Sequence, residues 1–240
     1  MVTVNGHTMN IAFAGLTAAG KTTHARRLAA DLCFNYVSAT DILFQLLEVG
    51  DPGVHPWFDR LGAINAAREG DIVDNELEAR LTELARTRER TVFDSWALAW
   101  ICPVPVVRIW IESDLPSRTR KCLVSLGDDP RPLNECEKVL RVKDDHNRAM
   151  FRRRHGFDLF TDRERYRAVL CNSHLIPSAT EQAAQRGIEA FAPVVRETAL
   201  AVMAGDEAVM TRLREQKPRE VLAVNGTQAG VACRAERTRA

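Results

Sequence analysis

Residues 15–22 of this chain form a complete G-x-x-x-x-G-K-[ST] pattern, and no other feature limits the possible fold as strongly. The pattern follows an apolar run at residues 9–14, which is typical of a buried parallel strand. A stretch without helix breakers comes next, at residues 23–32. A strand, a glycine-bearing turn and a helix in this order are what a phosphate-binding loop requires. The sequence therefore predicts that the chain binds the phosphates of a nucleotide.

The residue types in this loop suit that chemistry for separate reasons. Gly15 and Gly20 let the backbone turn tightly and approach phosphate without a Cβ atom in the way. Lys21 supplies a mobile cation for the outer phosphates, and the Thr22 hydroxyl is placed to bind Mg²⁺. The alternative, a structural turn that binds nothing, gives the lysine little purpose. We therefore expect a nucleoside triphosphate with Mg²⁺, bound by Gly15, Thr17, Ala18, Ala19, Gly20, Lys21, Thr22 and Thr23.

The rest of the chain alternates between strand and helix patterns. Apolar runs predict strands at residues 33–38, 90–94, 104–111 and 168–172, and helical patterning predicts helices at residues 40–49, 58–68, 74–86 and 180–204. Such alternation indicates a parallel sheet with helices on both faces. The expected fold class is α/β, a three-layer sandwich around a central parallel sheet, formed by a single domain at residues 1–216.

Composition argues against several kinds of partner. The chain has 33 Lys and Arg against 32 Asp and Glu, so no overall field attracts nucleic acid or a membrane surface. No apolar run approaches the ~20 residues that span a bilayer, and residues 1–10 lack the apolar core of a signal peptide. The six cysteines form no C-x-x-C pair, which favours reduced thiols and a cytoplasmic location. Residues 217–240 have little apolar periodicity and are expected to form a disordered tail.

The segment at residues 127–159 concentrates basic side chains in an otherwise neutral chain. Its central stretch contains Arg141, Lys143, Arg148, Arg152, Arg153 and Arg154 against Asp144 and Asp145. One interpretation is a solvated helix face, as for most charge runs. The other is a helical lid that closes over the transferred phosphoryl group, because phosphoryl transfer is catalysed mainly by positioning and positive charge. The phosphate loop favours the lid, and Gly127 and Gly156 are the expected hinges.

Four further segments resemble those of nucleoside monophosphate kinases, specifically the cytidylate kinase family in its shorter, archaeal-like form. They are residues 38–44, 73–80, 108–118 and 148–159. The resemblance runs from about residue 10 to residue 199 and implies a P-loop NTPase-type fold. It also implies an acceptor-binding region at about residues 38–90 and a lid at about residues 127–159. The implied activity is phosphoryl transfer from ATP to CMP or a related pyrimidine nucleotide, with Mg²⁺.

The resemblance also implies roles for individual residues. Lys21 holds the donor phosphates, Thr22 and Asp94 hold the magnesium ion, and the transferring phosphoryl group meets Arg118, Arg141 and Arg148. Ser38, Asp41, Asp74 and Arg80 are expected near the acceptor. For Asp74 and Arg80 the alternative of an ordinary pair on a helix surface stays open.

One departure from that family concerns the acceptor. Those kinases have an acid, a glycine and an arginine after the third strand, with the arginine reaching toward the acceptor monophosphate, whereas this chain has Asp94, Ser95 and Trp96. Trp96 cannot hold a phosphate dianion, although it can stack on a base or sugar. A second hypothesis is therefore a small-molecule kinase for a hydroxylated or modified-nucleoside acceptor, with Asp94 or Asp41 as the base. A third is a non-catalytic nucleotide-binding regulator.

Overall fold

One six-stranded sheet forms the centre of the molecule in the computed structural model, which describes residues 9–49, 56–127 and 131–224. Its strands are β1 (Asn10–Ala14), β2 (Asn35–Ser38), β3 (Thr91–Asp94), β4 (Val106–Glu112), β5 (Ala168–Cys171) and β6 (Val221–Val224), in the spatial order β2-β3-β1-β4-β5-β6. The first five strands run parallel, as the sequence predicts.

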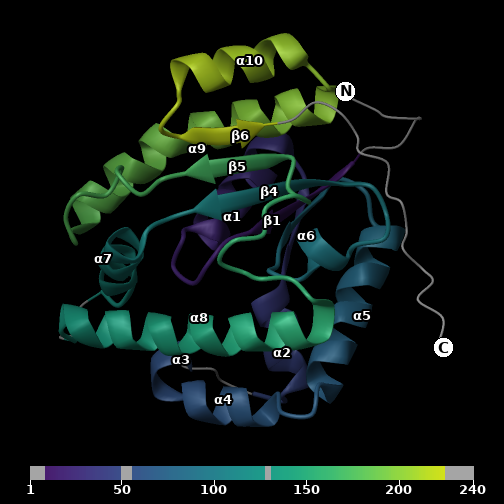
Figure 1. The fold of residues 1–240 in the computed structure, drawn as a ribbon, viewed down its shortest axis with the longest axis vertical. Helices are drawn as coiled ribbons and strands as arrows, with labels where there is room; N and C mark the ends of the chain where they lie inside the picture. The colour runs from purple at the N-terminus through teal and green to yellow at the C-terminus, as the bar shows by residue number, and fades with distance from the viewer. Residues whose placement is uncertain (1–8, 50–55, 128–130, 225–240) are drawn as a thin grey trace.

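Helices cover both faces of this sheet. In the described residues they are α1 (Lys21–Leu32), α2 (Ala39–Leu46), α3 (Pro56–Asp59), α4 (Leu61–Ala67), α5 (Ile72–Thr87), α6 (Leu98–Ile101), α7 (Leu115–Ser125), α8 (Leu133–His155), α9 (Glu181–Ala204) and α10 (Glu207–Gln216). In the view of Figure 1, α8 crosses between the sheet and the short helices α3 and α4. The helix predicted at residues 58–68 is thus split in two, and residues 50–55 before it lie outside the described residues.

The alternation of side chains along β1 separates two hydrophobic cores. Ile11 and Phe13 point to one face, where they join a core that α1, α9 and α10 contribute to. Ala12 and Ala14 point to the opposite face, toward a core that includes residues of α2, α5, α6 and α8. All four side chains are fully buried, as expected for a central strand that is covered on both sides. The predicted three-layer sandwich is confirmed.

The last strand corrects two predictions about the C-terminal part of the chain. β6 pairs with β5 in the antiparallel direction, so the sheet is mixed rather than purely parallel. β6 also lies inside the segment 217–240, which the sequence predicts to be a disordered tail; residues 225–240 lie outside the described residues. The charges and Pro218 dominate the composition of that segment, but Val221 and Val224 are apolar, β-branched and buried.

The strand order places a crevice beside the carboxyl end of β1. β3 and β4 flank β1 on either side, and Phe13 is in register with Asp94 and Ile109. In parallel α/β sheets, ligands bind where the crossover connections leave a central strand in opposite directions. The loop after β1 is the predicted phosphate-binding loop, so the fold places it in this position. None of the described helices combines the length and apolar content needed to cross a bilayer.

We predict that Gly187→Ala lowers the free energy of unfolding by about 1–3 kcal/mol, because overpacking a tight contact strains the core. A Cβ atom at Gly187 in α9 would lie 2.6 Å from Cγ1 of Ile176 and 2.8 Å from the carbonyl oxygen of Leu175. Gly62→Ala in α4 is the matched control, since no atom lies within 4 Å of its added Cβ. In urea unfolding, the free energy of unfolding of that control should be equal to or slightly higher than that of the wild type. Equal effects at both positions would contradict the packing argument.

Candidate functional site

The loop between β1 and α1 adopts a backbone that explains its two glycines. Gly15 has a φ of 150°, and a Cβ atom there would lie 2.5 Å from the carbonyl oxygen of Ile111. Gly20 has a φ of 91° and immediately precedes α1. Both conformations favour glycine, because a side chain would be strained or would collide with the neighbouring strand. Their effect is to bring the loop against the end of β4 with its amides near the start of α1.

Lys21 occupies the first position of α1 and is buried. Its Nζ donates a hydrogen bond to the carbonyl oxygen of Leu16 at 3.1 Å and lies 5.2 Å from the centre of the Trp96 ring. Burial lowers the pKa of Lys21, while the nearby carboxylates of Asp94 and Asp144 act in the opposite direction. A negatively charged ligand beside this ammonium therefore favours its charged form.

Thr22 and Asp94 meet at the opening of the loop. The Thr22 hydroxyl donates to Oδ2 of Asp94 at 2.5 Å, and the hydroxyl of Tyr36 approaches the same oxygen at 3.3 Å. Hard oxygen atoms that face a cavity suit Mg²⁺, which keeps several waters and binds through one or two protein ligands with substrate phosphates. The described residues contain no group of three or more His, Cys, Asp or Glu side chains that could hold a metal ion alone. The pair therefore fits a magnesium ion that is shared with a nucleotide.

A cavity of about 440 Å³ extends from this loop toward α2, α4, α5 and α8. Its size lies within the usual range for small-molecule sites. The predicted site residues that line it are Thr17, Ala18, Lys21, Thr22, Asp74, Asp94 and Trp96. Leu43, Phe58, Leu77 and Phe151 add apolar surface to its lining. The cavity is thus lined both by the phosphate-binding loop and by apolar side chains of the surrounding helices.

The helix α8 is already in contact with the phosphate loop. Asp144 accepts a hydrogen bond from the backbone N–H of Thr17 at 3.2 Å and forms a buried ion pair with Arg118 of α7. Arg118 also donates to the carbonyl oxygens of Thr17 and Ser113, at 3.1 and 3.2 Å. Arg118 thus lies beside the phosphate loop, where its contacts brace the loop against α8, and its predicted contact with the transferring phosphoryl group stays a prediction.

Several predicted site residues lie away from this cavity. Arg80 and Arg141 are exposed and bond Glu76 and Glu137, each one helical turn earlier. Arg148 donates to both oxygens of Asp158, at 2.8 and 2.7 Å. These three side chains therefore serve as local ion pairs here, because a partner on the same helix or the following loop is closer than the cavity.

Ala19 is buried and Thr23 is exposed, and neither lines the cavity. Two other predicted residues lie at the start of α2. Asp41 is exposed and does not line the cavity. Ser38 caps α2 by accepting a hydrogen bond from the N–H of Asp41 at 3.1 Å. Ser38 is also in register with Asp94, so it lies beside the site without lining it.

Several polar residues that were not among the predicted site residues also line the cavity. They include Arg68 at the end of α4, Asn147 on α8, and Lys143 on α8, which the sequence analysis named only as one basic residue of the lid segment. Burial and the neighbouring cations Lys21 and Arg68 hold the pKa of Lys143 well below its usual range. The spacing of Leu140, Asn147 and Phe151 could have identified this face of α8, since all three are buried and lie on one side of the helix.

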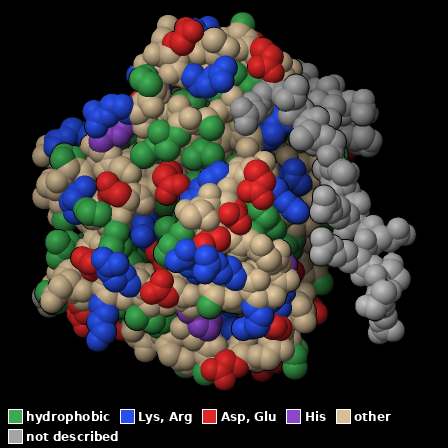
Figure 2. Space-filling view, in the orientation of Figure 1, with side chains coloured by type: hydrophobic (Ala, Val, Ile, Leu, Met, Phe, Trp, Pro, Cys, Tyr) green, Lys and Arg blue, Asp and Glu red, His purple; other side chains and the backbone are tan. Residues whose placement is uncertain are grey.

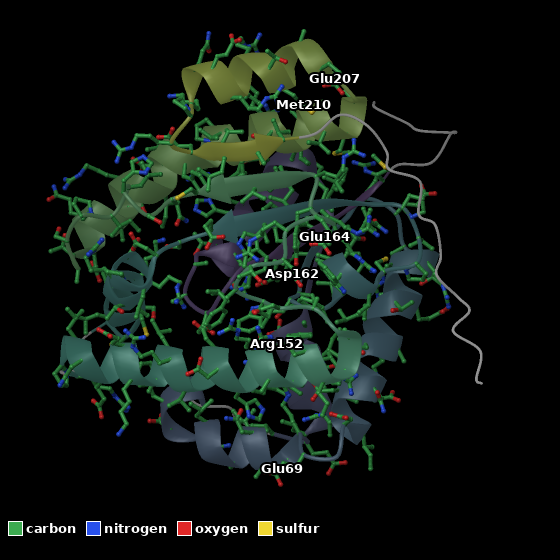
Figure 3. The ribbon with its side chains drawn as sticks, viewed as in Figure 1. Glu69, Arg152, Asp162, Glu164, Glu207 and Met210 are labelled. Carbon is green, nitrogen blue, oxygen red and sulfur yellow. The ribbon has the colours of Figure 1, made fainter. Side chains whose placement is uncertain are left out.

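The loop after α8 anchors the helix through charged groups. Arg148 and Arg152 both pair with Asp158, and the N–H of Asp158 donates to Asp162 at 2.7 Å. Figure 3 shows Arg152 at the end of α8 and Asp162 in the following loop. On the surface, basic and acidic side chains are interspersed over the face seen in Figure 2, in agreement with the balanced composition. Much of the positive charge of α8 is therefore neutralised by ion pairs within the molecule.

A phosphate loop at the carboxyl edge of a parallel sheet, with a helix closing over its cavity, defines a P-loop nucleotide-binding protein of the kinase type. The model of the cytidylate kinase-like family matches residues 10–174. The chain is 27% identical over 186 residues to the cytidylate kinase of Natronomonas pharaonis, covering 77% of this chain and 92% of that relative. It is 24% identical, with the same coverage, to the cytidylate kinase of Haloarcula marismortui.

A solved structure supports the same fold. An uncharacterized protein from Eubacterium ventriosum is similar with a TM-score of 0.54 and 8% identity, over 81% of this chain and 99% of that one. The chain belongs to the cytidylate kinase-like family and is an ATP-dependent kinase. The family resemblance seen in the sequence is confirmed, and the hypothesis of a non-catalytic regulator is set aside.

We predict that Asp158→Asn destabilises the protein by about 1–2 kcal/mol at pH 7, because two arginines lose a charged acceptor. The hydrogen bond from Arg148 lowers the pKa of Asp158 to about 2. A depressed folded-state pKa stabilises the protein above the unfolded pKa, and this contribution is lost as the pH falls from about 4 to about 2. Urea unfolding at pH 7 and pH 3 should therefore show a smaller difference at pH 3. The exposed Asp145→Asn is the control, and a pH-independent difference would contradict this account.

We predict that Lys21→Met lowers kcat/KM by at least about 100-fold, whereas Arg80→Ala and Arg141→Ala change it by no more than about twofold. Only Lys21 lines the cavity, and the two arginines lie in exposed pairs. The measurement is ADP release from Mg-ATP with the acceptor that gives the fastest turnover. A large loss in Arg141→Ala would restore the role that the sequence suggested for it.

Proposed function

We propose that this kinase transfers the γ-phosphoryl group of ATP to a nucleoside monophosphate, with CMP as the leading candidate. The observation that carries the proposal is the cavity that is lined by Lys21 and Thr22 and also by residues of α2, α5 and α8. A donor and an acceptor can lie in line in such a cavity, as phosphoryl transfer requires. The cytidylate kinase relatives support the choice of acceptor.

The donor end is proposed to use the phosphate loop. Lys21 and the loop amides hold the outer phosphates of ATP, and Thr22 and Asp94 hold Mg²⁺, which neutralises the charge on the phosphate oxygens. Lys21 must leave the carbonyl oxygen of Leu16 to reach the donor, and a phosphate oxygen replaces that acceptor. Arg118 keeps the loop in place through its contacts with Thr17 and Asp144.

The proposed reaction needs no general base. An oxygen of the acceptor phosphate is already ionised; it forms a bond to the γ-phosphorus while the bond from that phosphorus to the β–γ bridging oxygen breaks, and ADP leaves. The site must exclude water so that ATP is not hydrolysed. α8 contributes to this exclusion, because Leu140, Asn147 and Phe151 are buried between it and the rest of the site.

A hydroxyl acceptor is the second candidate, and Trp96 is the observation that favours it. Trp96 lines the cavity where the related kinases have an arginine, and its indole offers one N–H donor to an acceptor. A hydroxyl acceptor benefits from a base, and Asp94 is the candidate in the cavity, whereas Asp41 lies outside it. Asp94 would then have to serve both the metal and the acceptor.

We predict that one pyrimidine monophosphate stimulates ADP release at least about tenfold over the rate without acceptor. The assay uses purified protein and Mg-ATP with CMP, dCMP, UMP, AMP, GMP and cytidine as separate acceptors. Stimulation by CMP but not by cytidine supports the proposal, and stimulation by cytidine alone supports the hydroxyl acceptor. No stimulation by any of the five monophosphates, from a protein that binds ATP, would refute the proposed function.

A further inference from the structure

A buried hydrogen bond joins the phosphate loop to the residue that follows β5. Asn172 is that residue, and its Nδ2 group donates to the carbonyl oxygen of Ala19 at 2.9 Å. The backbone N–H of Asn172 donates to the carbonyl oxygen of Glu112 at the end of β4, at 3.2 Å. The backbone of Asn172 is therefore held by the sheet, and its buried side chain connects the carboxyl edge of the sheet to the loop.

Lys121 of α7 holds the amide of Asn172 in this orientation. A carbonyl oxygen only accepts hydrogen bonds, so the NH₂ group of Asn172 must face Ala19 and its Oδ1 must face the other way. There Oδ1 accepts a hydrogen bond from Nζ of Lys121 at 2.5 Å. The same Nζ donates to the hydroxyl of Ser113 at 2.8 Å. Lys121 thus links the segments after β4 and β5 and stabilises the rotamer of Asn172 that reaches the loop.

α7 therefore acts on two carbonyl groups of the phosphate loop. Arg118 donates directly to the carbonyl oxygen of Thr17 at 3.1 Å. Lys121 follows three residues later, on the same side of the helix, and reaches the carbonyl of Ala19 through Asn172. The direct contact and the relayed contact hold the loop at two points along its length.

The direction of a loop carbonyl determines the direction of the next amide. The peptide bonds of the described residues are trans, and in a trans peptide the C=O and N–H groups point in opposite directions. The hydrogen bond from Asn172 to the carbonyl of Ala19 therefore turns the N–H of Gly20 away from Asn172. A Cβ atom at Gly20 would lie 3.5 Å from Nδ2 of Asn172 and 3.5 Å from Cδ2 of His24, so both side chains lie next to this glycine. Backbone N–H groups at the start of a helix are the groups that bind phosphate.

We infer that Asn172 is a positioning residue for the phosphates of the donor nucleotide, and that Lys121 holds its amide in place. Asn172 keeps the carbonyl of Ala19 on the side of β5, so that the N–H of Gly20 is directed at the phosphates before the nucleotide binds. Donors that are already oriented bind an anion more tightly, because no binding energy is used to turn them. The inference rests on the donor end of the proposed function and does not depend on the identity of the acceptor.

The test measures binding of a non-hydrolysable ATP analogue with Mg²⁺ by isothermal titration calorimetry, without an acceptor. Asn172→Leu keeps nearly the same shape but leaves the carbonyl of Ala19 unpaired, and it should weaken binding by about 10- to 100-fold. Lys121→Met should weaken binding by about 3- to 10-fold, because the amide loses its partner. Arg120→Met is the matched control: it also removes a positive charge from α7, but Arg120 donates to the carbonyl oxygen of Ile176 at 2.7 Å. Its affinity should stay within about twofold of wild type.

A double variant separates positioning from a direct effect of the lysine charge. If Lys121 acts through Asn172, adding Lys121→Met to Asn172→Leu should weaken binding by no more than about twofold further. A loss in the double variant equal to the product of the two single losses would overturn the inference, as would wild-type affinity in Asn172→Leu.

Lys121→Met keeps the test decisive if Asn172→Leu does not fold, since Lys121 is partly exposed and its variant should give a normal circular dichroism spectrum. Wild-type affinity in Lys121→Met would also overturn the inference. The proposed function is tested separately by the wild-type protein. If the wild-type protein binds the analogue and the variants bind it equally well, only the inference fails. If the wild-type protein does not bind the analogue, the donor end of the proposed function fails and the inference fails with it.

Discussion

The buried ion pair between Arg118 and Asp144 is the interaction on which the arrangement of the site depends. It joins α7 to α8, and through Thr17 both partners also bond the phosphate loop. Two charges buried to this extent carry a desolvation cost, and loss of one partner leaves the other uncompensated at about 3–5 kcal/mol. Alternative positions of α8 that separate this pair while both groups stay buried are therefore disfavoured unless water or a ligand replaces the lost partner. The same carboxylate supports the charged form of Lys21, so the position of α8 also affects the electrostatics of the loop.

The parts of the fold and site that depend on local sequence could be predicted. The spacing of Gly15, Gly20 and Lys21 defined the loop, and apolar runs located the five parallel strands, because these signals are contained in a few adjacent residues. The strand at residues 221–224 was missed, since four residues in a charged and proline-containing segment give little periodicity. Its pairing with β5 depends on the tertiary structure, which composition does not encode.

The charged residues of α8 show why the rest of the site was harder to predict. In the sequence, the only acidic residues within the basic stretch of α8 are Asp144 and Asp145. In the structure, several of the basic residues have partners outside the helix: Arg154 bonds Glu78 on α5, and Arg148 bonds Asp158 in the following loop. A charge count within one segment cannot include such partners. Whether Arg141 or Lys143 faces the cavity depends on the rotation of the helix by a fraction of a turn, and the buried positions of Leu140 and Asn147 decide it in favour of Lys143.

The residue at position 96 links the phosphate loop to α8. A cation at this position would belong to the segment after β3, which the sheet fixes in place. In this chain Trp96 packs near Phe151 of α8, the ammonium of Lys21 lies over the Trp96 ring, and all three residues line the cavity. The apolar surroundings of this ammonium therefore depend in part on the position of α8. Because a charge interacts more strongly with an anion when its surroundings are less polar, the position of α8 affects how strongly Lys21 can bind a phosphate group.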